Sequence, residues 1–188
     1  MARPTASLFN SYTANDKRKA VTFMTSYVFN NVTTTLSISD ADPAKAISFQ
    51  KLWDRSAKTN GGEGTSRVAL RYADVLLIYA EAANEANGVP TEDAYTALNK
   101  VRFRAGLNKL EGLTYEAFRE AVWLERRLEL TFENCRRFDL VRTGKLEAAV
   151  KAENSFNRNA QFESYHTLFP IPVSDMDANP LLEQNDGY

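Results

Sequence analysis

The sequence is poor in the residues that build catalytic and metal sites. It has one cysteine, Cys135, and one histidine, His166, among 188 residues. A single cysteine cannot form an internal disulfide, and no cluster of Cys, Asp or Glu at ligand spacing accompanies His166. Glycine-rich phosphate loops, a GxSxG elbow and an HExxH motif are absent as well. We therefore expect no metal and no cofactor, with Cys135 a small buried hydrophobe in a helical pattern and His166 an ordinary loop or packing residue.

The sequence also lacks long apolar runs and an excess of charge of one sign. Lys and Arg number 23 and Asp and Glu number 24, which gives a formal net charge of -1. This balance provides no long-range field that would attract nucleic acid or an anionic membrane. No stretch approaches the ~18 uninterrupted apolar residues of a transmembrane helix, and the start of the sequence contains no apolar signal-peptide core. We therefore expect no nucleic-acid partner and no membrane-spanning segment.

The composition changes near residue 70. Residues 1–70 are rich in Ser, Thr and Asn and interleave aromatic with polar side chains, as at 20–25 and 48–53. Such alternation favours short strands and loops over helices. Glycines in 61–64 predict a flexible turn at 58–64, and we place the main boundary there. The expected organisation is an irregular loop and strand segment at 1–70, a candidate ligand-facing region, followed by a helical region with an extended tail at 71–188.

From residue 71 the apolar spacing is helical. The predicted buried face of the first helix carries Tyr72, Val75, Leu76, Tyr79, Ala83 and Ala86, widened by Ala73, Leu77 and Ala80. Gly88 should end this helix in a left-handed conformation. Thr91 should cap a second helix with a seam at Leu98, Val101 and Ala105. The pair with its short turn has the ~35-residue length of a tetratricopeptide unit. These features predict a mainly α fold with tetratricopeptide-like helical packing and an irregular, partly stranded N-terminal segment.

A third helix has the best-defined start in the sequence. Leu113, Thr114 and Phe118 occupy the N', N-cap and N4 positions of a hydrophobic staple. An apolar stripe then predicts one helix that continues to Gly144, with Ala121, Val122, Leu124, Leu128, Phe132 and Cys135 on it. A further helical stretch is expected at 145–151, and a loop at 154–164.

The last part of the sequence reads as a rigid tail. Pro170 and Pro172 require extended backbone around them. Ser174 with Asp177 resembles a capping box for a short helix that the Asn179-Pro180 pair should end. We expect residues 184–188 to be tied to the body by Tyr188, with binding to a partner protein as the alternative.

Several separate motifs, in a fixed order, carry a resemblance to one family. They are Arg71-Tyr72-Ala73-Asp74 with Leu76-Leu77 and Ala80-Glu81-Ala82; Val101-Arg102 and Arg104-Ala105-Gly106; Glu125-Arg126-Arg127 with Glu129-Leu130, Glu133, Arg136-Arg137, Asp139-Leu140 and Arg142; and Pro170-Ile171-Pro172, Asn179-Pro180 and Gln184-Asn185 with Gly187-Tyr188. Together they resemble the C-terminal region of the SusD/RagB family. Asp16-Lys17-Arg18 and Lys51 are weaker echoes before residue 71.

The resemblance implies a function and a place in the cell. Members of that family are surface lipoproteins that capture glycans and other nutrients for a SusC-like TonB-dependent outer-membrane transporter. We therefore expect non-catalytic binding of an oligosaccharide or other nutrient at the surface of the outer membrane. The secretion signal and the lipid-attachment cysteine are not in this sequence, so membrane attachment is expected only through an anchor outside it. The alternative is a helical tetratricopeptide-like scaffold that binds another protein and has no small-molecule ligand.

The charged residues of the motifs have two possible interpretations. As paired carboxylates with cationic neighbours they outline a glycosidase site, which would need two carboxylates facing an open cleft. As neighbours at helical spacing they pair instead, for example Glu133 with Arg136 and Arg137, and fasten helices together. We favour the second reading, since nearby charges more often form ion-pair networks than active sites. The predicted network consists of Arg71, Asp74, Arg102, Arg104, Glu125, Arg126, Glu129, Glu133, Arg137 and Asp139.

Aromatic residues before position 71 provide the candidate ligand platform. Sugar rings stack their C–H faces on aromatic rings while polar neighbours bind the hydroxyls. Trp53 is the first choice, with Phe49, Gln50 and Arg55 beside it. The competing interpretation, which we favour on general grounds, is that Trp53 and Phe49 pack this segment onto the helices.

Overall fold

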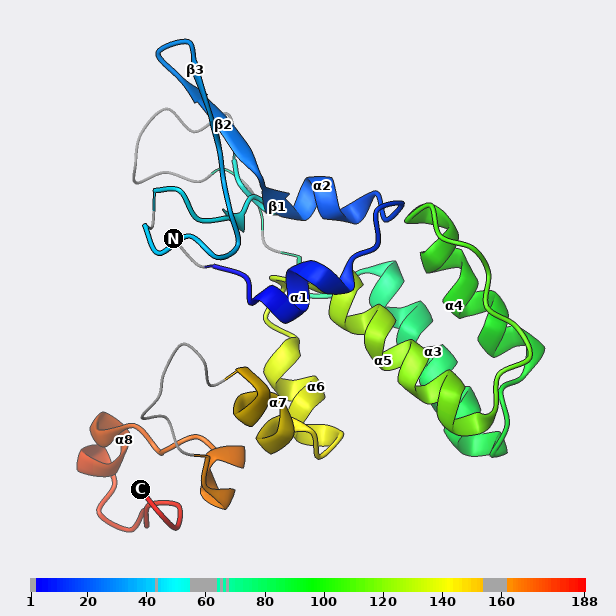
Figure 1. Cartoon of the computed structure of the whole chain (residues 1–188). Coiled ribbons are helices and arrows are strands. Elements are labelled where there is room, and N and C mark those ends of the chain that lie inside the picture. Colours follow the sequence, from blue (N-terminus) through cyan, green and yellow to red (C-terminus); the bar gives the residue numbers. More distant parts are fainter. Residues whose placement is uncertain (1–2, 43, 55–63, 65, 67, 154–161) are drawn as a thin grey trace. The chain divides into compact units, whose positions relative to one another are not determined.

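The computed structural model describes residues 3–42, 44–54, 64, 66, 68–153 and 162–188. The chain forms two compact units, Met1–Arg136 and Arg137–Tyr188. The first contains α1 (Ala6–Ser11), α2 (Arg18–Thr22), β1 (Phe23–Met24), β2 (Ser26–Phe29), β3 (Val32–Thr35), β4 (Ser48–Phe49), α3 (Tyr72–Asn87), α4 (Glu92–Arg104) and α5 (Tyr115–Glu129). Next come α6 (Arg136–Arg142), which begins at the boundary, α7 (Leu146–Glu153), the 3-10 turn η1 (Ser164–Thr167) and α8 (Val173–Ala178). The predicted mainly helical fold with a partly stranded N-terminal segment is confirmed (Figure 1).

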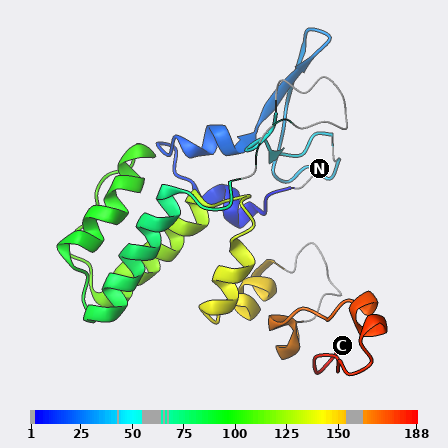
Figure 2. The ribbon, with the colours of Figure 1, turned by 180° about the vertical axis from the view of Figure 1, so that it is seen from behind.

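Helices α3, α4 and α5 lie side by side in the first unit (Figures 1 and 2). Their shared core is built from small and branched side chains, namely Leu77, Ala80, Ala94, Ala97, Leu98, Val101, Phe118 and Val122. Small residues let the helix axes approach, and larger ones fill the space between them. The predicted seam of α4 is confirmed, because Leu98, Val101 and Ala105 are all buried.

The ends of these helices follow local rules that the sequence shows. Thr91 and Thr114 are the N-caps of α4 and α5, and their hydroxyls accept the N–H groups of Ala94 and Ala117. Gly88 ends α3 at φ 65°. A side chain at such a φ is unfavourable, so glycine is the natural residue there. All three predicted boundaries are confirmed.

The predicted buried face of α3 is confirmed in part, because the residues predicted to widen it, Leu77 and Ala80, are its buried centre, whereas several residues of the predicted main stripe are exposed. Tyr72 and Tyr79 are 68% and 47% exposed, whereas Leu77, Ala80 and the polar Asn84 are buried. The helix contacts α4 and α5 on the side of its small residues. Periodicity located the amphipathic helix, but two neighbouring helices decide which of its apolar residues become buried.

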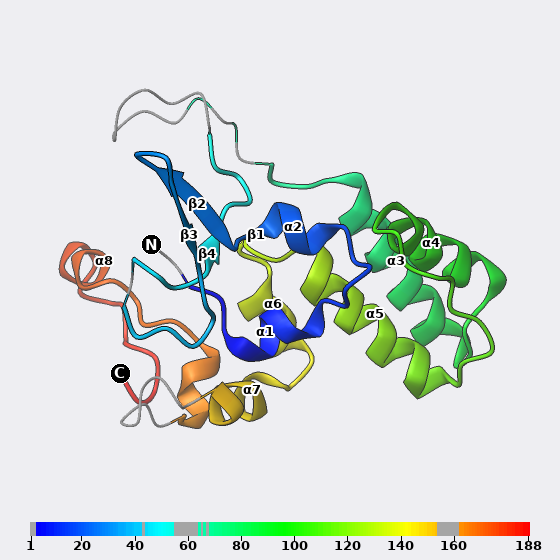
Figure 3. The same ribbon diagram turned by 45° about the horizontal axis from the view of Figure 1, so that its top comes forward.

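The N-terminal segment is more helical than its composition indicates. Helices α1 and α2 were not predicted, and α2 takes up part of the expected strand at 20–25. The strands form two antiparallel pairs, β1 with β4 and β2 with β3 (Figure 3). Asn30 and Asn31 join β2 to β3 with φ of 48° and 61°. Positive φ at both positions is the requirement of a type I′ hairpin turn, and asparagine tolerates it.

A second apolar cluster joins this segment to the end of α5. Tyr12 and Phe23 are almost fully buried and meet edge to face, with ring centroids 5.2 Å apart, against Leu128. The Tyr12 hydroxyl donates to the Leu128 carbonyl at 2.6 Å and lies 2.8 Å from Thr131 Oγ1. Burial raises the pKa of this hydroxyl above its usual value. The hydrogen bonds of the Tyr12 hydroxyl therefore fix the position of this largely apolar side chain against the end of α5.

The predicted single helix up to Gly144 was wrong. Helix α5 ends at Glu129, and α6 begins at Arg136 after a break in which Phe132 and Asn134 have φ of 65° and 63°. Cys135 lies in this break and is only partly buried. The Phe132 ring stacks on Phe49, with centroids 4.5 Å apart. The stack on Phe49 offsets the strain of the Phe132 backbone although Phe132 remains 44% exposed, and residue type alone gives no sign of this.

The second unit is held together by its tail. The Gln184 side chain pairs with both backbone groups of Ile171, and Asn185 donates to the Phe169 carbonyl. The Tyr188 hydroxyl donates to the Leu168 carbonyl at 3.0 Å. The predicted attachment of the tail is thus confirmed within this unit.

Two further expectations concern short elements of this unit. The capping box at Ser174 was wrong, because the N-cap of α8 is Pro172, two residues earlier, although Asn179 ends the helix as expected. A capping box exists instead at η1, where His166 Nδ1 accepts the N–H of Glu163 at 2.8 Å. The sole histidine therefore has a structural contact. In the described ranges, no helix has the length and apolarity needed to cross a membrane.

Candidate functional site

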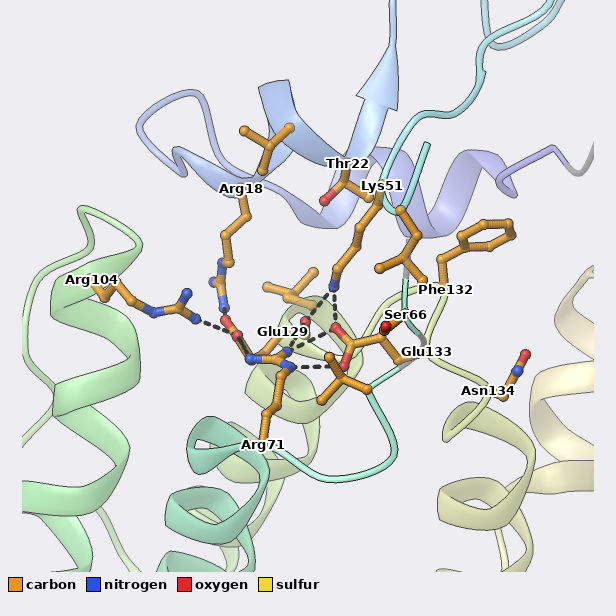
Figure 4. A pocket seen from close by; sticks show the side chains of 14 residues that line it. Arg18, Thr22, Lys51, Ser66, Arg71, Arg104, Glu129, Phe132, Glu133 and Asn134 are labelled. Carbon is orange, nitrogen blue, oxygen red and sulfur yellow. Dashed lines mark hydrogen bonds and ion pairs between the residues drawn. The ribbon is translucent and has the colours of Figure 1, made fainter. Parts of the chain in front are cut away.

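A cavity of about 440 Å³ opens in the first unit at the meeting point of five chain segments (Figure 4). These are α2, the turn after β4, the approach to α3, the end of α4 and the end of α5. It is lined by Arg18, Val21, Thr22, Lys51, Leu52, Ser66, Val68, Arg71, Arg104, Leu128, Glu129, Phe132, Glu133 and Asn134. One part of the lining is apolar and the other is a network of ion pairs.

Arg71, the N-cap residue of α3, joins two carboxylates of that network. Its Nε and Nη2 donate to Glu133 at 2.8 and 2.9 Å, which is a bidentate contact. Its Nη1 donates to Glu129 at 2.5 Å, and Nη2 also reaches the Glu129 carbonyl at 2.8 Å. Burial alone would lower the pKa of this guanidinium, but the two carboxylates raise it above its usual value. Arg71 therefore fastens the start of α3 to the end of α5.

Glu129 receives three guanidinium groups. Besides Arg71, Arg104 from α4 donates to its Oε1, and Arg18 from α2 donates to its Oε2 at 3.1 Å. The Glu129 side chain is only 3% exposed. A buried carboxylate without partners would be expensive, so the three cations are what allow this one to stay charged.

A deeper layer extends the network behind the cavity. Arg18 donates to Asp16 at 2.7 Å and to Glu125 at 2.6 Å, and Arg102 donates to Glu125 at 3.0 Å. Glu125 is 1% exposed. Burial alone would lower the pKa of Arg18, but the carboxylates of Asp16 and Glu125 raise it.

Lys51 approaches from the turn after β4. Its Nζ contacts Glu133 Oε1 at 2.5 Å and donates to the Glu129 carbonyl at 2.8 Å. Burial lowers the pKa of this ammonium despite its acidic partner Glu133, and nearby Arg71 lowers it further. The partners of Lys51 thus do not fully compensate its burial.

The electrostatics do not suit glycoside hydrolysis. Burial alone would raise the pKa of Glu129 and of Glu133, but their cationic partners, Arg71 above all, hold both below the usual value. A general acid needs the opposite, a carboxyl group that keeps its proton near neutral pH. Among the described residues, no group of three or more His, Cys, Asp or Glu side chains could hold a metal ion.

The structure brings most residues of the predicted network together, in two places. Arg71, Arg102, Arg104, Glu125, Glu129 and Glu133 lie in the cluster around the cavity. Asp74 and Arg126 form a separate pair between α3 and α5 at 2.7 Å.

Arg137 and Asp139 belong to the second unit and do not take part in that cluster. Arg137 donates to the carbonyls of His166 and Leu168 and lies over the Phe169 ring, and Asp139 pairs with Arg142. The expected pairing of Glu133 with Arg137 along one helix was wrong, because the helix breaks between them.

Three members of the cluster were not in the predicted set, namely Asp16, Arg18 and Lys51. They come from the segment before residue 71, where Asp16 pairs with Arg18, and the glutamate partners of Arg18 and Lys51 lie far away in the sequence. The only signal was their weak similarity to the family pattern. Spacing along a helix cannot reveal a partner that lies about a hundred residues away.

The four predicted ligand residues have different environments. Trp53 is 55% exposed and directly follows Lys51 and Leu52, which line the cavity. Phe49 is partly buried and contacts Phe23 as well as Phe132. The Gln50 amide donates to the carbonyls of Ala20 and Phe23. Arg55 and the predicted turn at 58–64 lie outside the described residues, apart from Gly64.

Comparison with known proteins gives the family. The SusD family model matches residues 2–188. The chain belongs to the SusD family. This is a family of non-catalytic, surface glycan-binding proteins, and this chain corresponds to a C-terminal portion of longer members.

The chain is similar to SusD-like protein P25 of Formosa agariphila, with 38% identity over 147 residues, 73% of this chain and 27% of that protein. It is also similar to the crystal structure of a SusD superfamily protein from Parabacteroides distasonis, with a TM-score of 0.80 and 31% identity, covering 99% of this chain and 42% of that one. A third similarity is to surface glycan-binding protein A of Bacteroides uniformis, with a TM-score of 0.74 and 28% identity over 97% of this chain and 40% of that one. The SusD-like chain thus spans less than half the length of these proteins, and its fold is the tetratricopeptide-like one of the family.

Proposed function

We propose that the protein to which this SusD-like chain belongs captures a glycan at the outer-membrane surface and delivers it to a SusC-like TonB-dependent transporter. Membership of the SusD family is the observation that carries this proposal. The similarity to a surface glycan-binding protein, over nearly the whole of this chain, adds support.

Within this chain, we assign the glycan contact to the turn formed by Lys51, Leu52 and Trp53. Leu52 has φ of 67°, a conformation that a leucine adopts only where surrounding contacts hold it. Lys51 and Leu52 face the cavity, and the exposed Trp53 ring lies next to them in the chain. An aromatic face beside polar donors is the arrangement by which proteins bind sugar rings.

Calorimetric titration tests this contact. The chain would be titrated with a panel of oligosaccharides, and the best ligand would be repeated with Trp53→Ala. Loss of one stacking surface should weaken binding about tenfold, or about 1.4 kcal/mol. Tyr79→Ala is the matched control, because this ring is also exposed but lies in the middle of α3. Equal losses in both variants, or none in either, would place the contact elsewhere.

Delivery to the transporter needs the longer protein. That protein is expected to co-purify with a TonB-dependent transporter from outer membranes. Addition of the glycan should change the amount of transporter recovered with it. Recovery of the protein without any such transporter, under conditions that preserve membrane complexes, would contradict the delivery step.

A further inference from the structure

Among the residues that the structure describes, the charged side chains that line the cavity do not balance. Its lining contains four cations and two carboxylates, namely Arg18, Lys51, Arg71 and Arg104 against Glu129 and Glu133. The deeper layer adds the carboxylates Asp16 and Glu125 and the cation Arg102. The cluster as a whole therefore has five cations and four carboxylates. Within this described set, cations outnumber carboxylates by one.

Two of the cations have all three guanidinium nitrogens engaged. Arg71 uses Nε, Nη1 and Nη2 on Glu129 and Glu133. Arg18 uses Nε and Nη2 on Asp16 and Nη1 on glutamate oxygens. Neither guanidinium can turn toward a ligand without breaking buried ion pairs.

The other two keep donors available. Among the described residues, Arg104 donates through Nη2 alone, to Glu129, and its side chain is 61% exposed. A guanidinium has five N–H donors, so most of this fork faces the open side. The Lys51 ammonium has three donors, and two contacts occupy it. Figure 4 shows these two side chains reaching the carboxylates from different elements.

The environment of Lys51 favours a further negative group beside its ammonium, which has two contacts for three donors. Its lowered pKa means that burial disfavours the ammonium more than its present partners stabilise it. A negative group near Nζ would supply the stabilisation that is lacking. Arg104 provides the geometry for such a group, because a guanidinium matches carboxylate and sulfate oxygens in a bidentate manner.

We infer that this cavity binds the acidic group of a glycan, a uronate carboxylate or a sulfate ester, with Arg104 as principal donor and Lys51 as the second. The apolar part of the lining, formed by Val21, Leu52 and Val68, would then contact the face of the sugar ring. This inference rests on the proposed glycan capture and makes it specific to acidic polysaccharides. Neutral relatives of the same sugars would bind without the ionic contribution.

Matched pairs of ligands test the inference by calorimetry with the whole chain. One pair is an oligogalacturonide and the neutral galacto-oligosaccharide of equal length, and the other is a sulfated galactan oligosaccharide and its desulfated form. In low salt, at least one acidic member should bind about tenfold more tightly than its neutral partner. The advantage should shrink in 0.5 M salt, because screening acts on the partly exposed Arg104. The two pairs separate the carboxylate from the sulfate.

Variants locate the effect. Arg104→Gln should reduce the acidic advantage to less than about threefold, Arg104→Lys should restore part of it, and Lys51→Gln should reduce it less than Arg104→Gln does. Lys109→Gln, an exposed ion-paired lysine outside the cavity, should change nothing. Thermal unfolding would verify that each variant is folded.

The outcomes distinguish the two proposals. Binding of neutral and acidic sugars with equal affinity overturns the acidic specificity and leaves glycan capture standing. An acidic advantage that Arg104→Gln does not alter overturns the assignment to this cavity. Absence of binding to every sugar, neutral or acidic, overturns both.

Discussion

Arg71 and Glu133 form a bidentate ion pair, with Nε and Nη2 of the arginine 2.8 and 2.9 Å from the two carboxylate oxygens. The pair links the first residue before α3 to the break that follows α5. Since Glu133 has left the helix, its carboxylate can meet Arg71 and Lys51 together. The break in α5 and the ion cluster are therefore two aspects of one arrangement.

The geometry of this pair predicts that charge alone cannot replace it. Arg71→Lys keeps the positive charge but loses the fork that engages both oxygens of Glu133 and reaches Glu129. The free energy of unfolding should fall by about 1–3 kcal/mol, measured by urea denaturation at neutral pH. Arg104→Lys is the matched control and should change it by less than about 0.5 kcal/mol, because that side chain is mostly exposed. Equal effects of the two substitutions would contradict the special role of the bidentate contact.

The lowered pKa values of Glu129 and Glu133 predict a loss of stability in acid. The unfolded chain takes up protons near the usual glutamate pKa of about 4.3, whereas the folded state resists protonation to lower pH. The stabilising contribution is therefore complete above that pH and is lost as the pH falls through the folded-state values. Urea denaturation at a series of pH values from 7 to 3 would measure it. In Glu133→Gln the free energy of unfolding should decline less steeply with falling pH. An unchanged slope would contradict a contribution of Glu133 to the acid sensitivity.

The break between α5 and α6 contains two residues with positive φ that should respond differently to glycine. Asn134→Gly should change the free energy of unfolding by less than about 0.5 kcal/mol, since asparagine already tolerates this conformation. Phe132→Gly should lower it by about 1 kcal/mol, because the stack on Phe49 and the covered part of the ring are lost. Thermal or urea unfolding of both variants gives the comparison. A stabilised Phe132→Gly variant would mean that backbone strain outweighs the ring contact.

What the sequence could predict here was local. The caps at Thr91 and Thr114 and the stop at Gly88 depend on a few neighbouring backbone groups, so residue type is enough to find them. The motifs also pointed to the family, because whole strings of residues matched. The mainly helical fold followed from the apolar spacing after residue 70.

What could not be predicted depends on distant contacts. In the break after α5, the Phe132 ring stacks on Phe49, more than eighty positions earlier in the chain. Tyr79 is exposed because α4 and α5 both pack against the small residues of α3. Arg18 joins the ion cluster through Glu125 and Glu129 on α5. The apolar periodicity around either partner does not indicate any of these pairings.

The central claim, that this SusD-like chain binds a glycan without transforming it, is tested most directly by one combined measurement. The chain would be titrated with a polysaccharide digest in a calorimeter, and the sugars recovered afterwards would be analysed by mass spectrometry. The account predicts saturable heat with at least one oligosaccharide and an unchanged mass of every sugar. Absence of heat with all of them, or the appearance of shortened products, would contradict it.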